Sequence, residues 1–309
     1  MQVRAPGRIT LMGEHTDYSG GLVLPVAIQL GITLSFEAAD GIALEAPGGE
    51  RYVEAVRAEL GALGRPDVGI AGRVEADLPQ GAGLGSSGAF EVAVALALCA
   101  TAGFELEPLE LALACQRAEQ RAVGVPSGIL DQAASLLGRA GSALFLDCDS
   151  LDHRWVPLPD DVAILVLDSG ERHSLERSGY GDRRRELEAG DPRRARHVES
   201  ENDRVRETVA ALERGDMRAL GPIFAAGHAS LRDDYEVSTP TLDALVAAAL
   251  EAGAFAARMT GGGFGGSIVA LAEPERAENV LAHAGVEGWI VRSADGAIRR
   301  RRGSTPDPA

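Results

Sequence analysis

The chain reads Leu78-Pro79-Gln80-Gly81-Ala82-Gly83-Leu84-Gly85-Ser86-Ser87-Gly88-Ala89-Phe90-Glu91 where a glycine-rich turn runs into a helix. The residues that follow are almost all apolar at helical spacing, which predicts a buried helix. A helix N-terminus presents unpaired N–H groups and the positive end of the helix dipole, and glycines let an anion approach the backbone. The segment therefore predicts a phosphate-binding loop, and the alternative is a turn with a serine N-cap.

This loop differs from two well-known phosphate-binding motifs. It lacks the Gly-Lys-Ser/Thr ending of a P-loop, and the chain contains no lysine, so any cationic contact to phosphate must come from arginine. A dinucleotide-binding fingerprint is also excluded, because Pro79 interrupts the approach to the loop. The expected phosphate contacts are Gly81, Gly83, Leu84, Gly85, Ser86 and Ser87.

Length and composition limit the classes of protein that are possible. A chain of 309 residues predicts two domains with sizeable cores. No segment approaches a transmembrane span, the N-terminus lacks the apolar core of a signal peptide, and Cys99, Cys115 and Cys148 have no metal-binding spacing. We therefore expect a cytoplasmic protein with reduced cysteines and no membrane partner. The net charge of −16 argues against nucleic-acid binding, and the run Arg299–Arg302 with its tail is expected to be a solvated, disordered end.

A polar segment near the N-terminus concentrates side chains suited to chemistry. Arg8, Glu14, His15 and Asp17 lie within ten positions of a glycine-bearing stretch, residues 7–21, which is expected to be a loop. Apolar residues interleave with them and would hold the polar groups in place. The elements predicted around this loop are a strand at 3–6, one or two strands at 22–36, a helix at 51–63 and a strand at 68–76.

A helix predicted over 108–123 carries a carboxylate on its apolar face. At 100° per residue, Ala112 and Cys115 lie beside Glu119. A buried carboxylate is costly unless it is paired or bound to a cation, so Glu119 meets either a buried arginine or a metal ion in a cleft. Glu91, by contrast, is expected in the first turn of its helix, where it would compensate the dipole.

The rest of the chain mixes strands and helices without strict alternation, which predicts an α+β fold. A Pro/Gly turn at 124–128 leads into a helix with Asp131 just inside its start, a commonplace position for a carboxylate. The polar connection between two predicted strands divides the chain into domains 1–155 and 156–309. The elements expected after that turn are strands at 143–146, 163–167 and 288–292, helices at 196–214, 217–230, 239–252 and 274–284, and a strand–glycine–strand hairpin at 255–272.

Three motifs resemble those of the GHMP small-molecule kinases. They are Arg4-Ala5-Pro6-Gly7-Arg8 through Tyr18, the loop at 79–87, and Met259-Thr260-Gly261-Gly262-Gly263-Phe264-Gly265-Gly266. The first motif resembles the galactokinase branch, and further matches lie at 128–132, 172–180 and 230–238. The resemblance covers nearly the whole chain. It implies a two-lobed fold, with an N-terminal lobe like a ribosomal-protein α+β domain, a ferredoxin-like C-terminal lobe and the active site between them.

The same resemblance implies a reaction and a set of residues. It implies ATP-dependent phosphorylation of galactose at the anomeric hydroxyl, with Asp131 as the catalytic carboxylate and Arg8 as its neighbour. A nearby arginine would keep the aspartate ionised and stabilise charge on the transferring phosphoryl group. The implied sugar-binding residues are Glu14, His15, Asp17, Gly128 and Tyr180, and the implied Mg²⁺ ligands are Ser87 and Glu119. The resemblance thus favours a metal ion for Glu119.

Departures from the galactokinase pattern keep other functions open. The phosphate loop reads Gly-Leu-Gly-Ser-Ser-Gly, closer to the mevalonate-kinase form, and Thr10 stands where asparagine is usual. The alternatives are a kinase for N-acetylgalactosamine or arabinose, and a non-catalytic galactose sensor with the kinase fold. Mevalonate is disfavoured because the residues at 14–18 suit a polyhydroxyl ligand, and the sensor because the residues for chemistry are all present. We expect a monomer or a weak homodimer.

Overall fold

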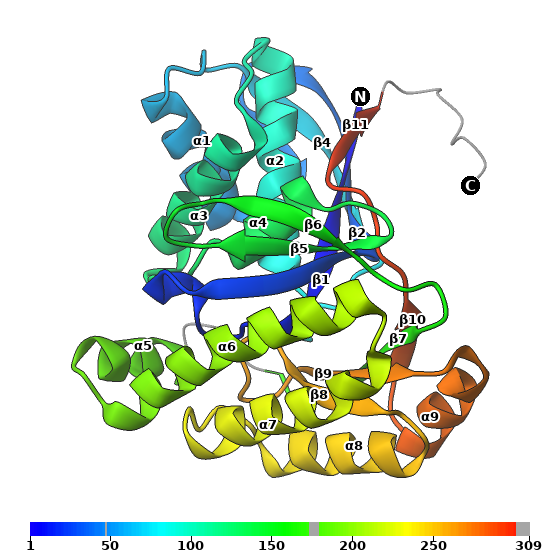
Figure 1. The fold of residues 1–309 in the computed structure, drawn as a ribbon. Helices are drawn as coiled ribbons and strands as arrows, with labels where there is room; N and C mark the ends of the chain where they lie inside the picture. Colours follow the sequence, from blue (N-terminus) through cyan, green and yellow to red (C-terminus); the bar gives the residue numbers. More distant parts are fainter. Residues whose placement is uncertain (47, 173–178, 301–309) are drawn as a thin grey trace.

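Two β-sheets organise the protein, as the computed structural model in Figure 1 shows; it describes residues 1–46, 48–172 and 179–300. The first sheet has seven strands and the second has four. Helices cover each sheet, and the two layered units meet along strand β1 (Gln2–Met12) and helix α6 (Pro192–Arg214). The expected two-lobed α+β architecture is confirmed.

The first sheet is built around two long antiparallel strands, β1 and β2 (Leu22–Ala39). β1 continues to Met12, so the loop expected from Gly7 is wrong over its first half. Ile9, Leu11 and Met12 are buried and keep residues 8–12 paired with β2, past a register shift that follows Pro6. The other strands of this sheet are β3 (Ile42–Glu45), β4 (Gly69–Ala76), β5 (Ser142–Asp147), β6 (His153–Pro157) and β11 (Ile298–Arg300).

Four helices lie beside the first sheet, at the upper left in Figure 1: α2 and α4 pack on its strands, and α1 and α3 pack on these two helices. They are α1 (Glu50–Ala62), α2 (Ser86–Ala102), α3 (Pro108–Val123) and α4 (Leu130–Leu137). α2 is buried along most of its length because small and branched apolar residues face every direction; Ala93, Val94 and Leu98 have no exposed surface. The predicted helices at 51–63 and 108–123 and the buried helix after the glycine loop are confirmed.

The second sheet has the strand order β10-β7-β9-β8, and all its pairs are antiparallel. Along the chain the strands and helices follow a β-α-β-β-α-β order, as expected for a ferredoxin-like lobe. The strands are β7 (Ala163–Asp168), β8 (Ala256–Thr260), β9 (Ser267–Ala272) and β10 (Gly288–Val291). The helices after α5 (Tyr180–Glu188) and α6 are α7 (Leu220–Asp233), α8 (Pro240–Glu251) and α9 (Ala277–Ala284), and single 3₁₀ turns lie at Asp17–Ser19, Met217–Ala219 and Pro274–Arg276.

Three short strands, β3, β6 and β11, lie outside the predicted elements. β6 buries only Val156, and all of β11 is exposed, so neither has a hydrophobic pattern that marks a strand. Arg299 and Arg300 are exposed, as a solvated end predicts, but they are ordered in a strand that pairs with Val3 and Gln2. Residues 301–309, with the tail that was expected to be disordered, lie outside the described residues. The division into domains 1–155 and 156–309 stays a prediction.

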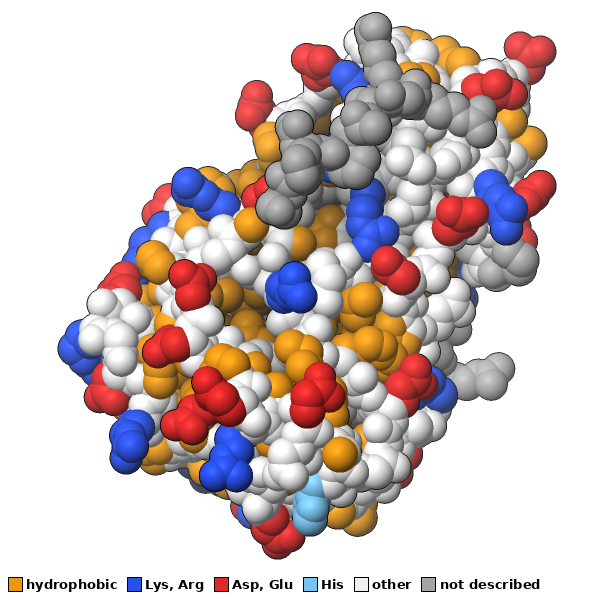
Figure 2. Space-filling model, turned by 90° about the vertical axis from the view of Figure 1, so that its right-hand side faces the viewer, with side chains coloured by type: hydrophobic (Ala, Val, Ile, Leu, Met, Phe, Trp, Pro, Cys, Tyr) orange, Lys and Arg blue, Asp and Glu red, His pale blue; other side chains and the backbone are white. Residues whose placement is uncertain are grey.

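The surface carries mixed charges. On the face in Figure 2, arginines and acidic residues are interspersed with apolar side chains rather than gathered by sign. Within the described ranges, no helix is both long enough and apolar enough to cross a bilayer. Cys99 and Cys115 are buried, Cys148 is half-buried, and all three are free thiols.

Candidate active site

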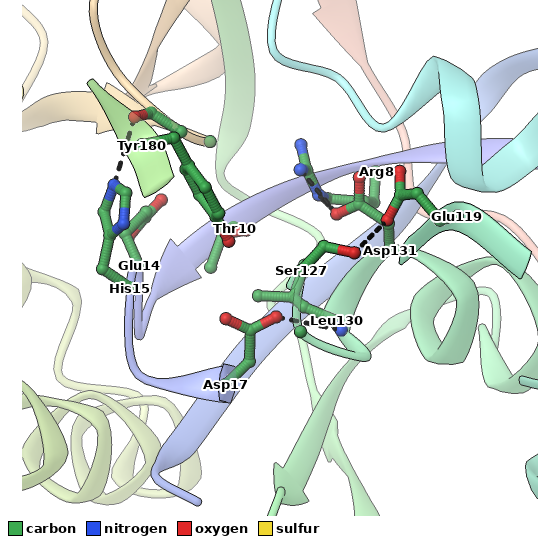
Figure 3. Close-up of a pocket in the computed structure, with 13 residues that line it drawn as sticks. Arg8, Thr10, Glu14, His15, Asp17, Glu119, Ser127, Leu130, Asp131 and Tyr180 are labelled. Carbon is green, nitrogen blue, oxygen red and sulfur yellow. Dashed lines mark hydrogen bonds and ion pairs between the residues drawn. The ribbon is translucent and has the colours of Figure 1, made fainter. Parts of the chain in front are cut away.

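A pocket lies where the two lobes meet, and most residues expected at the sugar site line it (Figure 3). Its walls come from β1, the turn after β1, α3, the start of α4, the start of α5 and the β8–β9 hairpin. The lining residues that the sequence predicted are Arg8, Glu14, His15, Asp17, Glu119, Gly128, Asp131 and Tyr180.

Arg8 and Asp131 form an ion pair at the centre of this pocket. Nε and Nη2 of Arg8 lie 2.7 Å and 2.6 Å from Oδ1 of Asp131. The Arg8 side chain is 9% exposed and that of Asp131 is 21% exposed, so the pair is shielded but open on one side. Nη1 of Arg8 also donates to the carbonyl oxygen of Gly83. The ion pair is therefore tied directly to the glycine-rich loop.

The loop has the backbone conformation that an anion-binding loop needs. Gly81, Gly83 and Gly85 have φ of 68°, 74° and 72°, a region in which other residues are strained. Gly85 precedes the first turn of α2 and supplies no side chain to cap it. The N–H groups at the start of α2 thus point toward the loop, as in other phosphate-binding helix N-termini.

The loop is held against the β8–β9 hairpin. Ser267 donates from Oγ to the carbonyl oxygen of Ala82 at 2.8 Å. A Cβ on Gly261 would lie 2.6 Å from the carbonyl oxygen of Gly83, so only glycine fits there. The sequence predicted that the hairpin backbone makes a close approach to a partner that the sequence does not identify. In the structure this partner is the glycine-rich loop.

Asp17 lies at the N-terminus of α4 together with Asp131. Oδ2 of Asp17 accepts a hydrogen bond from the N–H of Leu130 at 3.2 Å, which caps a helix that has no cap of its own. Burial raises the pKa of Asp17 to about 6, and the hydrogen bond from Leu130 opposes that rise. A Cβ on Gly128 would lie 1.8 Å from Oδ2 of Asp17, so the glycine leaves the space that this carboxylate occupies.

His15 is neutral and fixed in one tautomer. Burial lowers the pKa of His15 to about 3. Nε2 lies 3.1 Å from the carbonyl oxygen of Gly262, which can only accept, so Nε2 carries the proton and donates. Nδ1 therefore accepts from the Tyr18 hydroxyl at 2.9 Å, and the Tyr235 hydroxyl donates to Tyr18 at 2.7 Å. The ring of Tyr180 packs 5.2 Å from that of His15 and closes this side of the pocket.

Glu119 bonds to polar neutral groups. Its Oε1 accepts from Ser87 Oγ at 2.8 Å, and its Oε2 accepts from Ser127 Oγ at 2.6 Å and Gln132 Nε2 at 3.2 Å. Among the described residues no arginine pairs with it, so the buried ion-pair alternative is wrong. Burial, then the charge of Asp131, raises the pKa of Glu119.

Glu91 is placed differently from its prediction. It lies beyond the first turn of α2 and is fully buried, so it does not act as a surface charge at the helix N-terminus. Its Oε2 accepts from Gln132 Nε2 at 3.0 Å. The same amide nitrogen donates to Glu119, and burial raises the pKa of Glu91 well above its ordinary value. The dipole interpretation considered helix position alone and missed that this face packs against α4.

Several pocket residues carry no signal that a single sequence reveals. Thr10 in β1 is fully buried, and no described residue bonds its hydroxyl oxygen. Ser127 and the carbonyl of Gly262 also face the pocket. Each lies in or beside a sequence segment that was singled out for its other residues. Only the fold shows that these three groups face the site. His173 and Ser174, which were part of the matched stretch, lie outside the described residues.

A second cavity of about 410 Å³ lies on the far side of the glycine-rich loop. Tyr52, Val74, Leu78 and Phe90 give it apolar walls, and Ser86 and Ser87 join it to the start of α2. A cavity with apolar walls that opens onto a glycine-rich loop has the features of a nucleotide site. Ser86 and Ser87, together with Glu45 and Gln80, give this cavity polar groups as well.

Comparison with known proteins agrees with this geometry. Residues 1–38 match the family model described as the galactokinase galactose-binding signature, and residues 50–139 and 208–286 match the models for the GHMP kinase N-terminal and C-terminal domains. Galactokinase from Bos taurus is 40% identical, in a match that covers 92% of this chain and 86% of that protein. The chain belongs to the galactokinase family.

Other members of the galactokinase family match to a similar extent. Galactokinase from Thermococcus kodakarensis is 36% identical, and the match covers 91% of each chain. The crystal structure of Lactococcus lactis galactokinase complexed with galactose superimposes with a TM-score of 0.86 at 29% identity, over 96% of this chain and 94% of that one. The GHMP kinase fold of this family member is therefore confirmed.

Proposed function

We propose that the protein transfers the γ-phosphoryl group of ATP to the C1 hydroxyl of galactose. The observation that carries this proposal is the Arg8–Asp131 ion pair, which lies between a pocket rich in carboxylates and a glycine-rich loop. Membership in the galactokinase family supports both the reaction and the sugar.

Asp131 is the group that contacts the reacting hydroxyl. Arg8 occupies Oδ1 and leaves Oδ2 open to the pocket, so Oδ2 accepts the hydrogen bond from the C1 hydroxyl. Arg8 also reaches the glycine-rich loop, where its positive charge stabilises the transferring phosphoryl group. Positioning and electrostatics dominate such transfers, which suits a site with one carboxylate and one guanidinium.

The polar pocket suits a sugar because its free acceptors are aimed inward. Glu14 and Asp17 each present a carboxylate, and Thr10 presents a hydroxyl. Acceptors that are buried in this way reject a ligand that lacks the matching hydroxyl, since they would then stay unpaired. Tyr180 and His15, whose ring planes are tilted by 42°, give aromatic surface against which a sugar ring can pack.

ATP would place its base in the second cavity and its phosphates over the N-terminus of α2. Ser87 and Glu119 fit a magnesium ion, because a hydroxyl and a buried carboxylate 2.8 Å apart are both hard oxygen ligands. Within the described ranges no group of three or more His, Cys, Asp or Glu could hold a metal ion. When bound, Mg²⁺ neutralises charge on the phosphates.

ADP release from Mg-ATP in the presence of different acceptors tests this function. The panel is galactose, glucose, N-acetylgalactosamine, arabinose and mevalonate, and a response to galactose is expected. A response to another sugar alone would keep the kinase and change its acceptor. Silence with every acceptor, while galactose still binds by calorimetry, would instead indicate a sugar sensor.

A further inference from the structure

The carboxylate of Glu14 is bonded by an arginine of the C-terminal lobe that does not line the pocket. Arg258 in β8 donates from Nη2 to Oε2 of Glu14 at 2.6 Å and to Oε1 of Glu201 in α6 at 2.7 Å. The side chains of all three residues are essentially unexposed. One guanidinium nitrogen is therefore shared between two carboxylates, one from each lobe.

Helix α6 holds the backbone of the same turn. Oε1 of Glu201 also accepts from the N–H of Gly13 at 3.0 Å, and its Oε2 accepts from Nε of Arg204 at 2.7 Å. One helical turn earlier, Nε2 of His197 lies 3.1 Å from the carbonyl oxygen of Glu14 and donates to it. Helix α6 thus bonds the Gly13 N–H and the Glu14 carbonyl, and its Glu201 also bonds the arginine that holds the Glu14 side chain.

This network uses only half of the Glu14 carboxylate. Oε2 is bonded to Arg258, whereas Oε1 is buried and receives no donor from any described residue. Glu14 lines the polar pocket beside Thr10 (Figure 3). A buried carboxylate oxygen without a donor is costly, and a hydroxyl of a ligand in the pocket would satisfy it.

We propose that Arg258 and Glu201 are positioning residues of the sugar site, which orient Glu14 so that Oε1 faces a hydroxyl of the bound sugar. This role rests on the proposed function, because it takes Glu14 as a sugar contact. Arg258 suits this role, since its Nη2 reaches both carboxylates at once and burial excludes water from the two contacts. Neither residue lines the pocket, so both act through Glu14.

The network also sets the charge on Glu14. Burial raises the pKa of Glu14, Arg258 opposes the rise, and the like charge of Glu201 adds to it, so that the pKa is about 7. Burial by itself would raise the pKa of Glu201, but the charge of Arg258 opposes this effect and the pKa falls to about 2. The charged and titratable groups that face this carboxylate pair are Arg8 from β1, His197, Glu201 and Arg204 from α6, and Arg258 from β8.

Glu201→Gln is the first test. We expect its KM for galactose to rise about 10- to 100-fold, because a charged hydrogen bond that orients Glu14 is lost, while its KM for ATP changes less than about twofold. Calorimetric galactose affinity between about pH 5.5 and 8.5 adds a second readout. In the wild type, affinity increases as Glu14 ionises near pH 7. In Glu201→Gln the midpoint moves to lower pH, because a like charge next to Glu14 is gone.

Arg258→Lys gives the opposite shift and replaces the first variant if that one does not fold. Lysine keeps the positive charge, but its shorter side chain removes the hydrogen bond to Oε2 of Glu14. Galactose therefore binds more weakly, and the midpoint moves to higher pH because the ionised carboxylate is stabilised less. Glu59→Gln is the matched control, because Glu59 also binds two arginines, Arg117 at 3.0 Å and Arg121 at 2.7 Å, outside the pocket. Glu14→Gln isolates the pH dependence that remains from Asp17.

The outcomes separate the positioning role from the proposed function. Folded Glu201→Gln or Arg258→Lys with the wild-type KM for galactose and the wild-type midpoint would overturn the positioning role. A loss of galactose affinity without any shift of midpoint would also overturn it, since a purely structural role predicts that result. A wild-type protein that neither binds nor phosphorylates galactose would instead refute the proposed function.

Discussion

Arg8 pairs with a single oxygen of Asp131: its Nε donates a hydrogen bond to Oδ1 at 2.7 Å, and its Nη2 lies 2.6 Å from the same oxygen. The second carboxylate oxygen, Oδ2, is bonded by none of the described residues. It lies at the start of α4 and faces Gly85 of the glycine-rich loop. Such one-sided pairing holds the carboxylate in place without occupying the oxygen that a substrate hydroxyl needs. The ion pair is thus compatible with catalysis, whereas a two-oxygen pair would block it.

Asp131→Asn is expected to lower kcat about 10²- to 10⁴-fold, because the amide cannot accept the hydroxyl proton. The galactose Kd should change little, since the pocket is otherwise intact. Steady-state kinetics and calorimetry measure the two quantities. Asp203→Asn, on the exposed face of α6, is the matched control and should keep the wild-type kcat. A kcat for Asp131→Asn equal to that of the control would remove Asp131 from the reaction.

Gly128→Ala is expected to abolish measurable galactose affinity while the protein still folds. The new Cβ would lie 1.8 Å from Oδ2 of Asp17, so the carboxylate must leave its position in the pocket. Gly61→Ala in α1 is the control, because no atom lies within 4 Å of the corresponding Cβ. Calorimetry with galactose measures the effect, and wild-type affinity in Gly128→Ala would show that Asp17 makes no contact with the sugar.

Asp17→Asn is expected to stabilise the protein at high pH. The pKa of Asp17 is about 6 when folded, against an ordinary 3.8. Above pH 6 the folded protein carries an ionised buried carboxylate, and this cost disappears as the pH falls below 3.8, where both states are protonated. The variant should therefore gain about 1 to 3 kcal/mol in free energy of unfolding at pH 8 and lose that gain by pH 4.

Urea unfolding of Asp17→Asn at both pH values measures this difference, with the exposed Asp149→Asn as control. The same variant should bind galactose more weakly, since the pocket loses a charged acceptor. Equal stabilisation at both pH values would contradict the buried-carboxylate explanation.

Magnesium dependence follows from Ser87 and Glu119. We expect excess chelator to abolish ADP formation by the wild type. Glu119→Gln should lose the Mg²⁺-dependent increase in ATP affinity, because an amide is a poor ligand for a hard cation. Calorimetry with ATP, with and without Mg²⁺, measures that increase. Glu110→Gln, at an exposed position of the same helix, is the control. An unchanged Mg²⁺ effect in Glu119→Gln would place the ion elsewhere.

Local patterns in the sequence predicted those parts of the site that depend on one element. The 100° spacing along α3 placed Glu119 inside, and the glycine loop before α2 was evident from composition. The resemblance to a kinase family named most of the residues that line the pocket. Only the fold shows which of these residues contact one another.

Contacts between distant segments could not be predicted in this way. Asp17 caps a helix that begins 113 positions later, and Arg258 reaches a glutamate from the other lobe. Neither contact leaves a periodic signal, because each depends on how two sheets pack. Glu91 was misassigned for the same reason, since its burial comes from α4 rather than from its own helix.

The return of the chain to its first sheet has a mechanical consequence. The chain passes from β6 to β7 through residues 158–162, and it passes back from β10 to β11, where Arg299 pairs with Val3. Two lobes joined by two connections move relative to each other less freely than two lobes joined by one. We therefore expect the opening that admits a sugar or releases its phosphate to be a rotation about the line through the two connections.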